Sequence, residues 1–208
     1  MKTLSEWQSK RRLEGLPYPR EQLTTSRAEA QEFVAALARP VVAKASGVAH
    51  KTEGGLVRFG IDERSIGAVW DELAAAGDGT VLLAEQISAE LELIVGGYRD
   101  PGFGPLVTVG LGGIAAEVFG DVVALLAPPE PGELAAALQQ LSGRKLLQGV
   151  RGGPPVDIEA LARILNVVAA LLIQDASVAE IDCNPVMVCK GKPVVVDALV
   201  VLSDDAAA

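Results

Sequence analysis

Apolar residues recur along the chain with helical spacing in several segments. The segment after Ser26 places hydrophobic side chains at positions i, i+3, i+4 and i+7, namely Ala30, Phe33, Val34 and Leu37. This spacing gathers them on one face of a helix, and a serine with a glutamate three residues later is a typical helix start. The sequence therefore predicts an amphipathic helix that begins after Ser26.

Three more segments have helical character. One follows Ser65, and a longer one follows Asp157, each with an apolar stripe of the same period. A third is expected after the prolines at 128–131, with Leu134, Leu138 and Leu141 facing inward. Serine and aspartate are favoured residues at the position before a helix, so Ser65 and Asp157 are the expected caps.

Short apolar runs between these helices predict strands. They lie at 41–44, 54–61, 80–87, 91–98 and 106–110, and two more form the C-terminal region from 178 to 202. The run at 91–98 alternates, with Leu91, Leu93 and Val95 on one face and Glu92 on the other, as a half-buried strand requires. Because helices and strands are mixed throughout, the predicted fold class is α+β.

The two C-terminal strands predict a specific pairing. If Lys190 and Gly191 form a two-residue turn, the hairpin register places Asn184 directly opposite Asp197. Directly opposed side chains are close enough to share one Mg²⁺, which prefers oxygen ligands. Asp182 lies on the same face of its strand and is a further acidic candidate. The alternative is a turn-forming asparagine before a proline and an ordinary strand-edge aspartate.

Composition narrows the possible partners. Half of the 208 residues are hydrophobic and the formal net charge is −9, so we expect no nucleic-acid partner and no anionic membrane surface. No apolar run is long enough for a membrane helix, and residues 1–15 do not resemble a signal peptide. The expected location is the cytoplasm. A nucleotide would need local lysines, backbone amides and a cation to bind such an acidic protein.

Other residues are candidates for nucleotide contacts, each with a plain structural alternative. Lys44 ends an apolar strand and suits a phosphate, although strand-end lysines commonly reach into solvent. Gly112 and Gly113 lie in a glycine-rich turn whose amides suit an anion, although such turns are often only turns. Glu85 and Glu92 suit a ribose, or a solvated strand face. The spacing of a P-loop is absent.

His50 is the only histidine of the chain, and it follows Lys44 in a glycine-containing turn. A neutral imidazole is a competent nucleophile for phosphoryl transfer. The alternative is an exposed loop histidine that contacts nothing.

Several segments together resemble one protein family. They are VVAKASGVAHKTEGG from residue 41, LLAEQI from 82, ELIVGGYRDPGFGPLVTVGLGGIAAEVFGDV from 92, GVRGGPPVDI from 149, and EIDCNPVMV from 180 followed by VVVDA. The chain is similar to the ATP-grasp β component of the ADP-forming acyl-CoA synthetases, in the succinyl-CoA synthetase superfamily. The resemblance implies an ATP-grasp fold of two lobes that close over nucleotide, as a single domain 1–208. About 1–85 would form the N-terminal segment and smaller lobe, and about 86–208 the larger lobe.

The resemblance also implies an activity and a set of roles. Members convert an acid, CoA and ATP into acyl-CoA, ADP and phosphate through a phosphohistidine, with ATP/ADP and Mg²⁺ bound. The implied nucleotide contacts are Lys44 at the phosphates, the hinge Glu85 to Ile87 at adenine, and Glu92 at the ribose. Arg99, as a catalytic residue, and Gly112 and Gly113 would lie near phosphate or near the phosphorylated intermediate.

The remaining implied roles concern the metal and the phosphoryl group. Asn184 and Asp197 correspond to the Mg²⁺ ligands, His50 to the phosphorylated histidine, and Lys51 to a residue that stabilises the product. The segment between Lys44 and His50 is shorter than in many members of the family.

The family's CoA-binding domain has no counterpart in these residues. We therefore expect a separate CoA-binding α subunit, a hetero-oligomer, and a small carboxylic acid or acyl phosphate as the other reactant. Two alternatives remain open: a stand-alone ATP-grasp ligase that joins a carboxylate to an amine, and a non-catalytic module that senses nucleotide.

Overall fold

The computed structural model describes residues 1–47, 55–113, 120–150 and 152–204. The chain forms two compact units, a smaller one of Tyr18–Ile87 and a larger one of Met1–Pro17 together with Ser88–Ala208. The N-terminal segment thus belongs to the larger unit, whereas the sequence grouped it with the smaller lobe. The chain passes between the units twice, at 17/18 and at 87/88.

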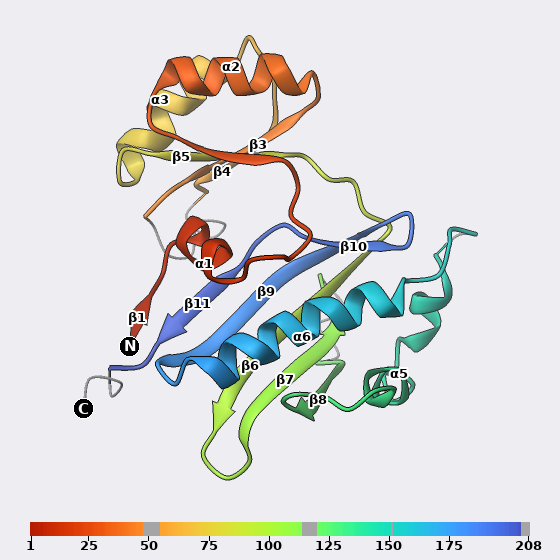
Figure 1. The fold of residues 1–208 in the computed structure, drawn as a ribbon. Helices are drawn as coiled ribbons and strands as arrows, with labels where there is room; N and C mark the ends of the chain where they lie inside the picture. The colour runs from red at the N-terminus through yellow and green to blue at the C-terminus, as the bar shows by residue number, and fades with distance from the viewer. Residues whose placement is uncertain (48–54, 114–119, 151, 205–208) are drawn as a thin grey trace. The chain divides into compact units, whose positions relative to one another are not determined.

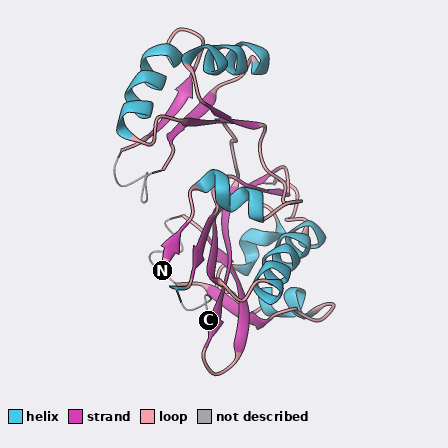
Figure 2. Cartoon of the chain, turned by 60° about the vertical axis from the view of Figure 1, so that its left-hand side comes forward, coloured by secondary structure: helices cyan, strands magenta, loops and turns pink. Residues whose placement is uncertain are grey.

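The smaller unit is a four-stranded antiparallel sheet with two helices on one face (Figures 1 and 2). Its elements are β2 (Glu21–Thr24), α2 (Arg27–Leu37), β3 (Val41–Ala45), β4 (Val57–Ile61), α3 (Ile66–Ala76) and β5 (Val81–Glu85), with strand order β2-β5-β3-β4. Phe33 of α2, Leu73 of α3 and Leu83 of β5 meet in its buried core.

The larger unit is built on a seven-stranded sheet. Its strands are β1 (Lys2–Thr3), β6 (Leu91–Asp100), β7 (Gly104–Leu111), β8 (Val122–Leu126), β9 (Val178–Cys189), β10 (Lys192–Val195) and β11 (Leu199–Leu202). The order is β1-β11-β9-β6-β7-β8, and β10 also pairs with β9. Its helices are α1 (Glu6–Arg12), α5 (Glu133–Leu138) and α6 (Ile158–Gln174), with the 3-10 helix η1 (Arg144–Gln148).

Local capping signals explain where the helices start. The Ser26 hydroxyl accepts the Glu29 amide proton at 3.3 Å, and the Asp157 carboxylate accepts that of Ala160 at 2.9 Å, which confirms both predicted caps. Ser65 precedes α3 but makes no side-chain cap. Helix α5 ends at Leu138, so it is shorter than expected.

Helix α6 crosses one face of the large sheet (Figure 1). A side chain at Gly97 of β6 would collide with Leu172 and Val168 of α6, so the glycine permits close packing of helix on strand. Because strand residues alternate between faces, the residues next to Gly97 in β6 point away from α6. No helix in the described ranges is both long and apolar enough to cross a membrane.

The C-terminal pairing confirms the predicted hairpin. Cys189 pairs with Lys192 across the Lys190-Gly191 turn. Beyond β10, the same register resumes, with Asp182 paired to Leu199 in β11. The Val196 amide donates to the Pro185 carbonyl at 3.2 Å between these two stretches. Continuity of the register places Asn184 opposite Asp197.

The packing of α6 yields a stability prediction. Leu165 is fully buried, so Leu165→Ala is expected to lower the free energy of unfolding of the larger unit by about 2 to 5 kcal/mol. Ile173→Ala on the same helix, where the side chain is 47 % exposed, should change it by no more than about 0.5 kcal/mol.

The two tryptophans allow the larger unit to be followed alone. Trp7 lies in the larger unit and Trp70 in the smaller one. Urea unfolding is therefore measured by Trp7 fluorescence in a Trp70→Phe background. Equal losses from the two α6 substitutions would contradict the packing described here.

Candidate functional site

Strand β9 contains a bulge at Asn184 and Pro185. The pairing of β9 with β6 shifts between Leu93 and Val95, so that Asn184 and Pro185 both stand opposite Ile94. Such bulges bend a strand and redirect its side chains. The bulge falls at the residue that the sequence identified as a metal ligand.

Three polar side chains converge next to this bulge. The Asn184 side chain hydrogen-bonds Asp182, and the charge of Asp197 also acts on Asp182. Asp197 comes from the connection between β10 and β11, and its Oδ1 accepts the Ala198 amide proton at 2.9 Å. Asn184 is exposed, whereas the two aspartates are half-buried. We call Asp182, Asn184 and Asp197 the acidic cluster.

The acidic cluster carries more negative charge than its surroundings stabilise. Burial, together with the nearby charges of Glu180 and Asp197, raises the pKa of Asp182 to about 6, while the hydrogen bond from Asn184 acts in the opposite direction. A carboxyl group with a raised pKa among like charges is stabilised in its ionised form by a cation. The cluster therefore fits a bound cation electrostatically.

The donor set suits Mg²⁺ in particular. No group of three or more His, Cys, Asp or Glu side chains forms a metal site within the described ranges, which argues against an all-protein cage. Mg²⁺ instead keeps several waters and takes one or two carboxylates together with substrate phosphates. An amide oxygen on Asn184 and carboxylates on Asp182 and Asp197 match that requirement.

Glu92 and the glycine turn lie together in the larger unit. The Gly112 amide donates to the Glu92 carbonyl at 2.7 Å, and a side chain at Gly113 would come within 3.0 Å of Glu92 Oε2. Gly113 also has a positive φ of 63°, which favours glycine. Glu92 points away from α6, and so does Asp182, which pairs with Gly96. The structure thus brings Glu92, both glycines and the acidic cluster to one sheet.

Lys44 belongs to the smaller unit and points away from its helices. Val41, Ala43 and Ala45 of β3 pack in the helix-covered core, so alternation places Lys44 on the opposite face. Its cross-strand neighbours there are Leu82 of β5 and Val57 of β4. The residue is only 8 % exposed. It is therefore not the solvated lysine that the structural alternative required.

Glu85 ends β5 just before the chain leaves the smaller unit at Ile87. Its carboxylate pairs with Arg39 at 2.7 Å, and its amide donates to the Arg20 carbonyl at 2.8 Å. The Arg20 bond ties together the two chain segments near the crossings between units. The hinge role of this position and adenine recognition by its backbone both stay predictions.

Arg99 has a different environment from the one expected. Its guanidinium donates to the carbonyls of Val178 and Asp175, both at 2.8 Å, and to that of Leu172. These carbonyls lie at the end of α6 and just beyond it, where helix carbonyls lack partners within the helix. Arg99 is also seven residues from Glu92, about 23 Å along β6. The structure therefore favours a helix-capping role over the expected phosphate contact.

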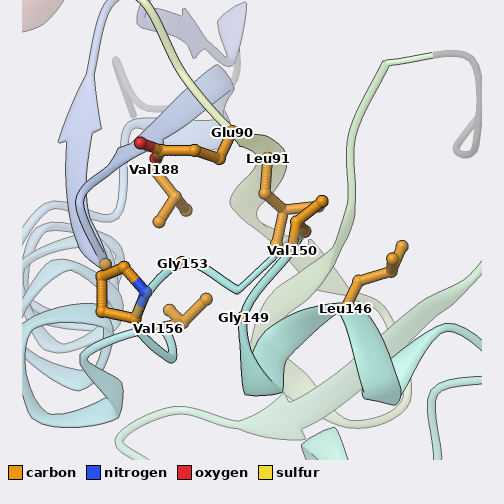
Figure 3. A pocket seen from close by; sticks show the side chains of 10 residues that line it. Glu90, Leu91, Leu146, Gly149, Val150, Gly153, Val156 and Val188 are labelled. Atoms are coloured by element: carbon orange, nitrogen blue, oxygen red, sulfur yellow. The ribbon is translucent and has the colours of Figure 1, made fainter.

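The loop before α6 forms a small hollow with the hairpin (Figure 3). Its walls are largely apolar, with Leu91, Val156 and Val188 among the side chains that line it. Glu90 lies at this hollow, but its carboxylate accepts the Lys190 amide proton at 2.9 Å. The hollow lies where the loop meets the hairpin, and among the described residues that line it Glu90 alone has a charged side chain.

Two predicted residues, His50 and Lys51, lie outside the described residues. A buried ion pair in α1, between Glu6 and Lys10, was not predicted from the sequence. Its spacing of four residues is the signal that could have found it, since i,i+4 pairs of opposite charge face each other on a helix.

A mixed α+β chain in two units, with a buried lysine on one sheet and the acidic cluster on the other, agrees with the class of ATP-grasp folds. Residues 1–202 match the model of the ATP-grasp domain family. The chain belongs to this family.

Curated relatives share about a third of the sequence. The chain is 32 % identical over 202 residues to the beta subunit of Acetate–CoA ligase [ADP-forming] I from Pyrococcus furiosus, covering 92 % of this chain and 87 % of that one. It is 33 % identical over 187 residues to Acetate–CoA ligase [ADP-forming] I of Archaeoglobus fulgidus, covering 85 % of this chain. Of that longer relative it spans only 27 %.

Solved structures of the same kind superpose closely. Acetyl-coenzyme A synthetase 1 of Ca. Korarchaeum cryptofilum, in complex with coenzyme A and Ca-AMPCP, gives a TM-score of 0.88 at 32 % identity, with 97 % of this chain and 94 % of that chain covered. A second structure of that enzyme, with coenzyme A and Mg-AMPPCP, gives 0.83 at 32 % identity, with 97 % and 93 % covered.

The capping role of Arg99 is testable. Arg99→Ala is expected to lower the stability of the larger unit by about 1 to 3 kcal/mol, because carbonyls at the end of α6 lose a charged donor. Affinity for Mg-AMPPCP should stay within twofold of the parent's. Trp7 fluorescence during urea unfolding and calorimetric titration measure the two quantities. If Arg99→Ala left the stability unchanged and strongly lowered the affinity for Mg-AMPPCP, Arg99 would be a phosphate contact and its capping role would be wrong.

Proposed function

We propose that this chain is the ATP-binding, phosphoryl-transferring subunit of an ADP-forming acyl-CoA synthetase. The overall reaction converts an acid, CoA and ATP into acyl-CoA, ADP and phosphate. The observation that carries the proposal is the register that sets Asn184 against Asp197 beside Asp182. The names of the relatives and of the superposable structures support the same activity.

Within this proposal, the residues of the chain divide the work of holding a nucleotide. The acidic cluster would hold Mg²⁺, which when bound neutralises the phosphate oxygens and orients them for transfer. Lys44 would supply a point charge to the phosphates, and Glu92 would accept from the ribose hydroxyls. Amides of Gly112 and Gly113 would approach the phosphates unobstructed by side chains.

Phosphoryl transfer depends mainly on positioning and charge neutralisation. We assign the acceptor role to His50, whose imidazole nitrogen would form a P–N bond as the bond from the γ-phosphorus to the bridging oxygen breaks and ADP leaves. Histidine has an ordinary pKa of about 6.5, so a neutral nucleophile is available at pH 7. In the reverse direction His50 would receive the group from a partner's phosphohistidine, and Lys51 would stabilise the phosphorylated product.

The second half of the reaction is assigned to a partner. A relative that is 32 % identical to this chain is named as a beta subunit, which supports a partner subunit. We assign to that partner the binding of CoA and of the small acid or acyl phosphate, as an α subunit that completes the site. The product of this chain's own step would be the phosphohistidine and ADP.

The metal assignment is tested by Asp197→Asn. The change removes a charge but keeps the side-chain shape. The factor by which Mg²⁺ increases the affinity for AMPPCP should therefore fall by more than about tenfold. Calorimetric titration of AMPPCP at a series of free Mg²⁺ concentrations measures this dependence and also gives the metal-free affinity, which should be unchanged.

Glu159→Gln is the matched control, because it removes one carboxylate from an exposed position of the same unit. It should leave the Mg²⁺ dependence as it is in the parent. Equal effects of the two substitutions, or none from Asp197→Asn, would remove the cluster from the proposed site.

The phosphoryl acceptor is tested by labelling. Since His50 is the only histidine, an acid-labile, alkali-stable label that is identified as phosphohistidine after transfer from [γ-³²P]ATP to the purified chain must lie on it. The label is expected in the parent and absent in His50→Ala, while Mg-AMPPCP binding persists in both. The chain with acetate, CoA and Mg-ATP should form no acyl-CoA until an α subunit is added.

Other outcomes point elsewhere. Undiminished labelling of His50→Ala, with acyl-CoA synthesis intact in the complex, would overturn the acceptor role. Release of ADP on adding an acid and an amine without CoA would indicate a carboxylate–amine ligase. Nucleotide binding without any exchange of label between ADP and ATP would indicate a nucleotide sensor.

A further inference from the structure

Helix α1 contains an ion pair that is almost completely buried. Lys10 Nζ lies 2.8 Å from Glu6 Oε1, and the two side chains are only 2 % and 3 % exposed. Burying two charges is costly, and replacing such pairs with apolar residues is often neutral or favourable for stability. Stability alone therefore does not account for a charged pair at this position.

The lysine of this pair also holds the backbone that carries a proposed metal ligand. Lys10 Nζ donates to the Val196 carbonyl at 3.1 Å, and Val196 is the residue before Asp197. On its other side, the Val196 amide donates to the Pro185 carbonyl at 3.2 Å, and Pro185 follows Asn184. The segments that present Asp197 and Asn184 are thus joined directly, and Lys10 fixes that junction.

The rest of the N-terminal segment holds the flanks of the same connection. The Ser9 hydroxyl accepts the Val200 amide proton at 3.0 Å, and the Leu4 amide donates to the Val200 carbonyl at 3.0 Å. Upstream, the Val195 amide donates to the Pro17 carbonyl at 2.8 Å. Lys10 is the contact nearest to Asp197 among these.

Electrostatics place Lys10 close to the acidic cluster. Burial, together with the charges of Asp182 and Asp197, raises the pKa of the Cys183 thiol to about 12, and the charge of Lys10 acts in the opposite direction. The lysine thus acts on the residue that lies between Asp182 and Asn184. Because Glu6 neutralises Lys10, the pair adds no net positive charge that would repel a cation.

We propose that the Glu6–Lys10 pair is a positioning element for the cation site: it fixes the backbone at Val196 so that Asp197 stays opposite Asn184, without adding net charge. The inference rests on the proposed function, because it presumes that the acidic cluster takes Mg²⁺ with nucleotide. In this proposal Glu6 and Lys10 act on the cation site only through the position of Asp197.

The test is the charge-neutral double variant Glu6→Gln/Lys10→Met, which removes the bond to the Val196 carbonyl and leaves the net charge unchanged. The factor by which Mg²⁺ increases the affinity for AMPPCP, measured by calorimetry, should fall by about tenfold. This effect is typical of residues that orient metal ligands. Metal-free AMPPCP affinity should stay within twofold of the parent's.

Ser9→Ala is the matched control from the same helix. It removes a buried bond to Val200 but not the one at Val196, so it should lower the melting temperature and leave the Mg²⁺ dependence within twofold. A merely structural role of α1 predicts instead that the double variant and Ser9→Ala shift the Mg²⁺ dependence alike, which would overturn the proposal.

The single change Glu6→Gln provides a second readout in case the double variant does not fold. It keeps the shape of the pair but leaves the Lys10 charge uncompensated next to the cluster, so Mg²⁺ dependence should weaken several-fold; an unchanged value overturns the proposal. If the parent itself shows no Mg²⁺-dependent AMPPCP binding, the proposed function fails first, and the two failures are thereby distinguished.

Discussion

The larger unit depends on one strand, β9, which is hydrogen-bonded along both edges. On one edge it pairs with β10 and β11 in one register from Cys189–Lys192 as far as Glu180–Val201, and on the other it pairs with β6 across a bulge. A one-residue slip in either pairing would turn every side chain to the opposite face. The positions of Asp182 and Asn184 therefore follow from backbone pairing, and Asp197 lies in the short connection that joins two strands paired with β9.

The features that could be predicted from sequence are those with local causes. The caps at Ser26 and Asp157 and the Lys190-Gly191 turn each act within a few residues, so the helices and the hairpin register followed from them. Helix α1 was not predicted, because its buried residues are Glu6, Ser9 and Lys10 and its inward face is therefore polar. A search for apolar periodicity passes over such a helix, although its charge spacing is visible.

The features that could not be predicted depend on distant partners. An arginine beside a glycine- and proline-rich loop is compatible with phosphate binding or with a helix cap, and only the placement of the end of α6 decides for Arg99. The bulge opposite Ile94 likewise arises from a pairing between strands far apart in sequence. The roles of Lys44 and Glu92 were suggested by family resemblance, and the structure adds the burial of the first and the glycine contacts of the second.

Charge distribution connects these observations. A chain with a net charge of −9 that binds a polyphosphate must overcome repulsion, and it could do so by placing basic side chains at the acidic cluster. Lys10 of α1 is the basic side chain that contacts the backbone next to Asp197, at the Val196 carbonyl, and its charge is already neutralised by Glu6. The surplus negative charge, visible in the raised pKa of Asp182, is thereby left for an exchangeable cation. Under the proposed function, a site organised in this way would bind phosphate strongly only together with its metal, which would couple nucleotide affinity to Mg²⁺.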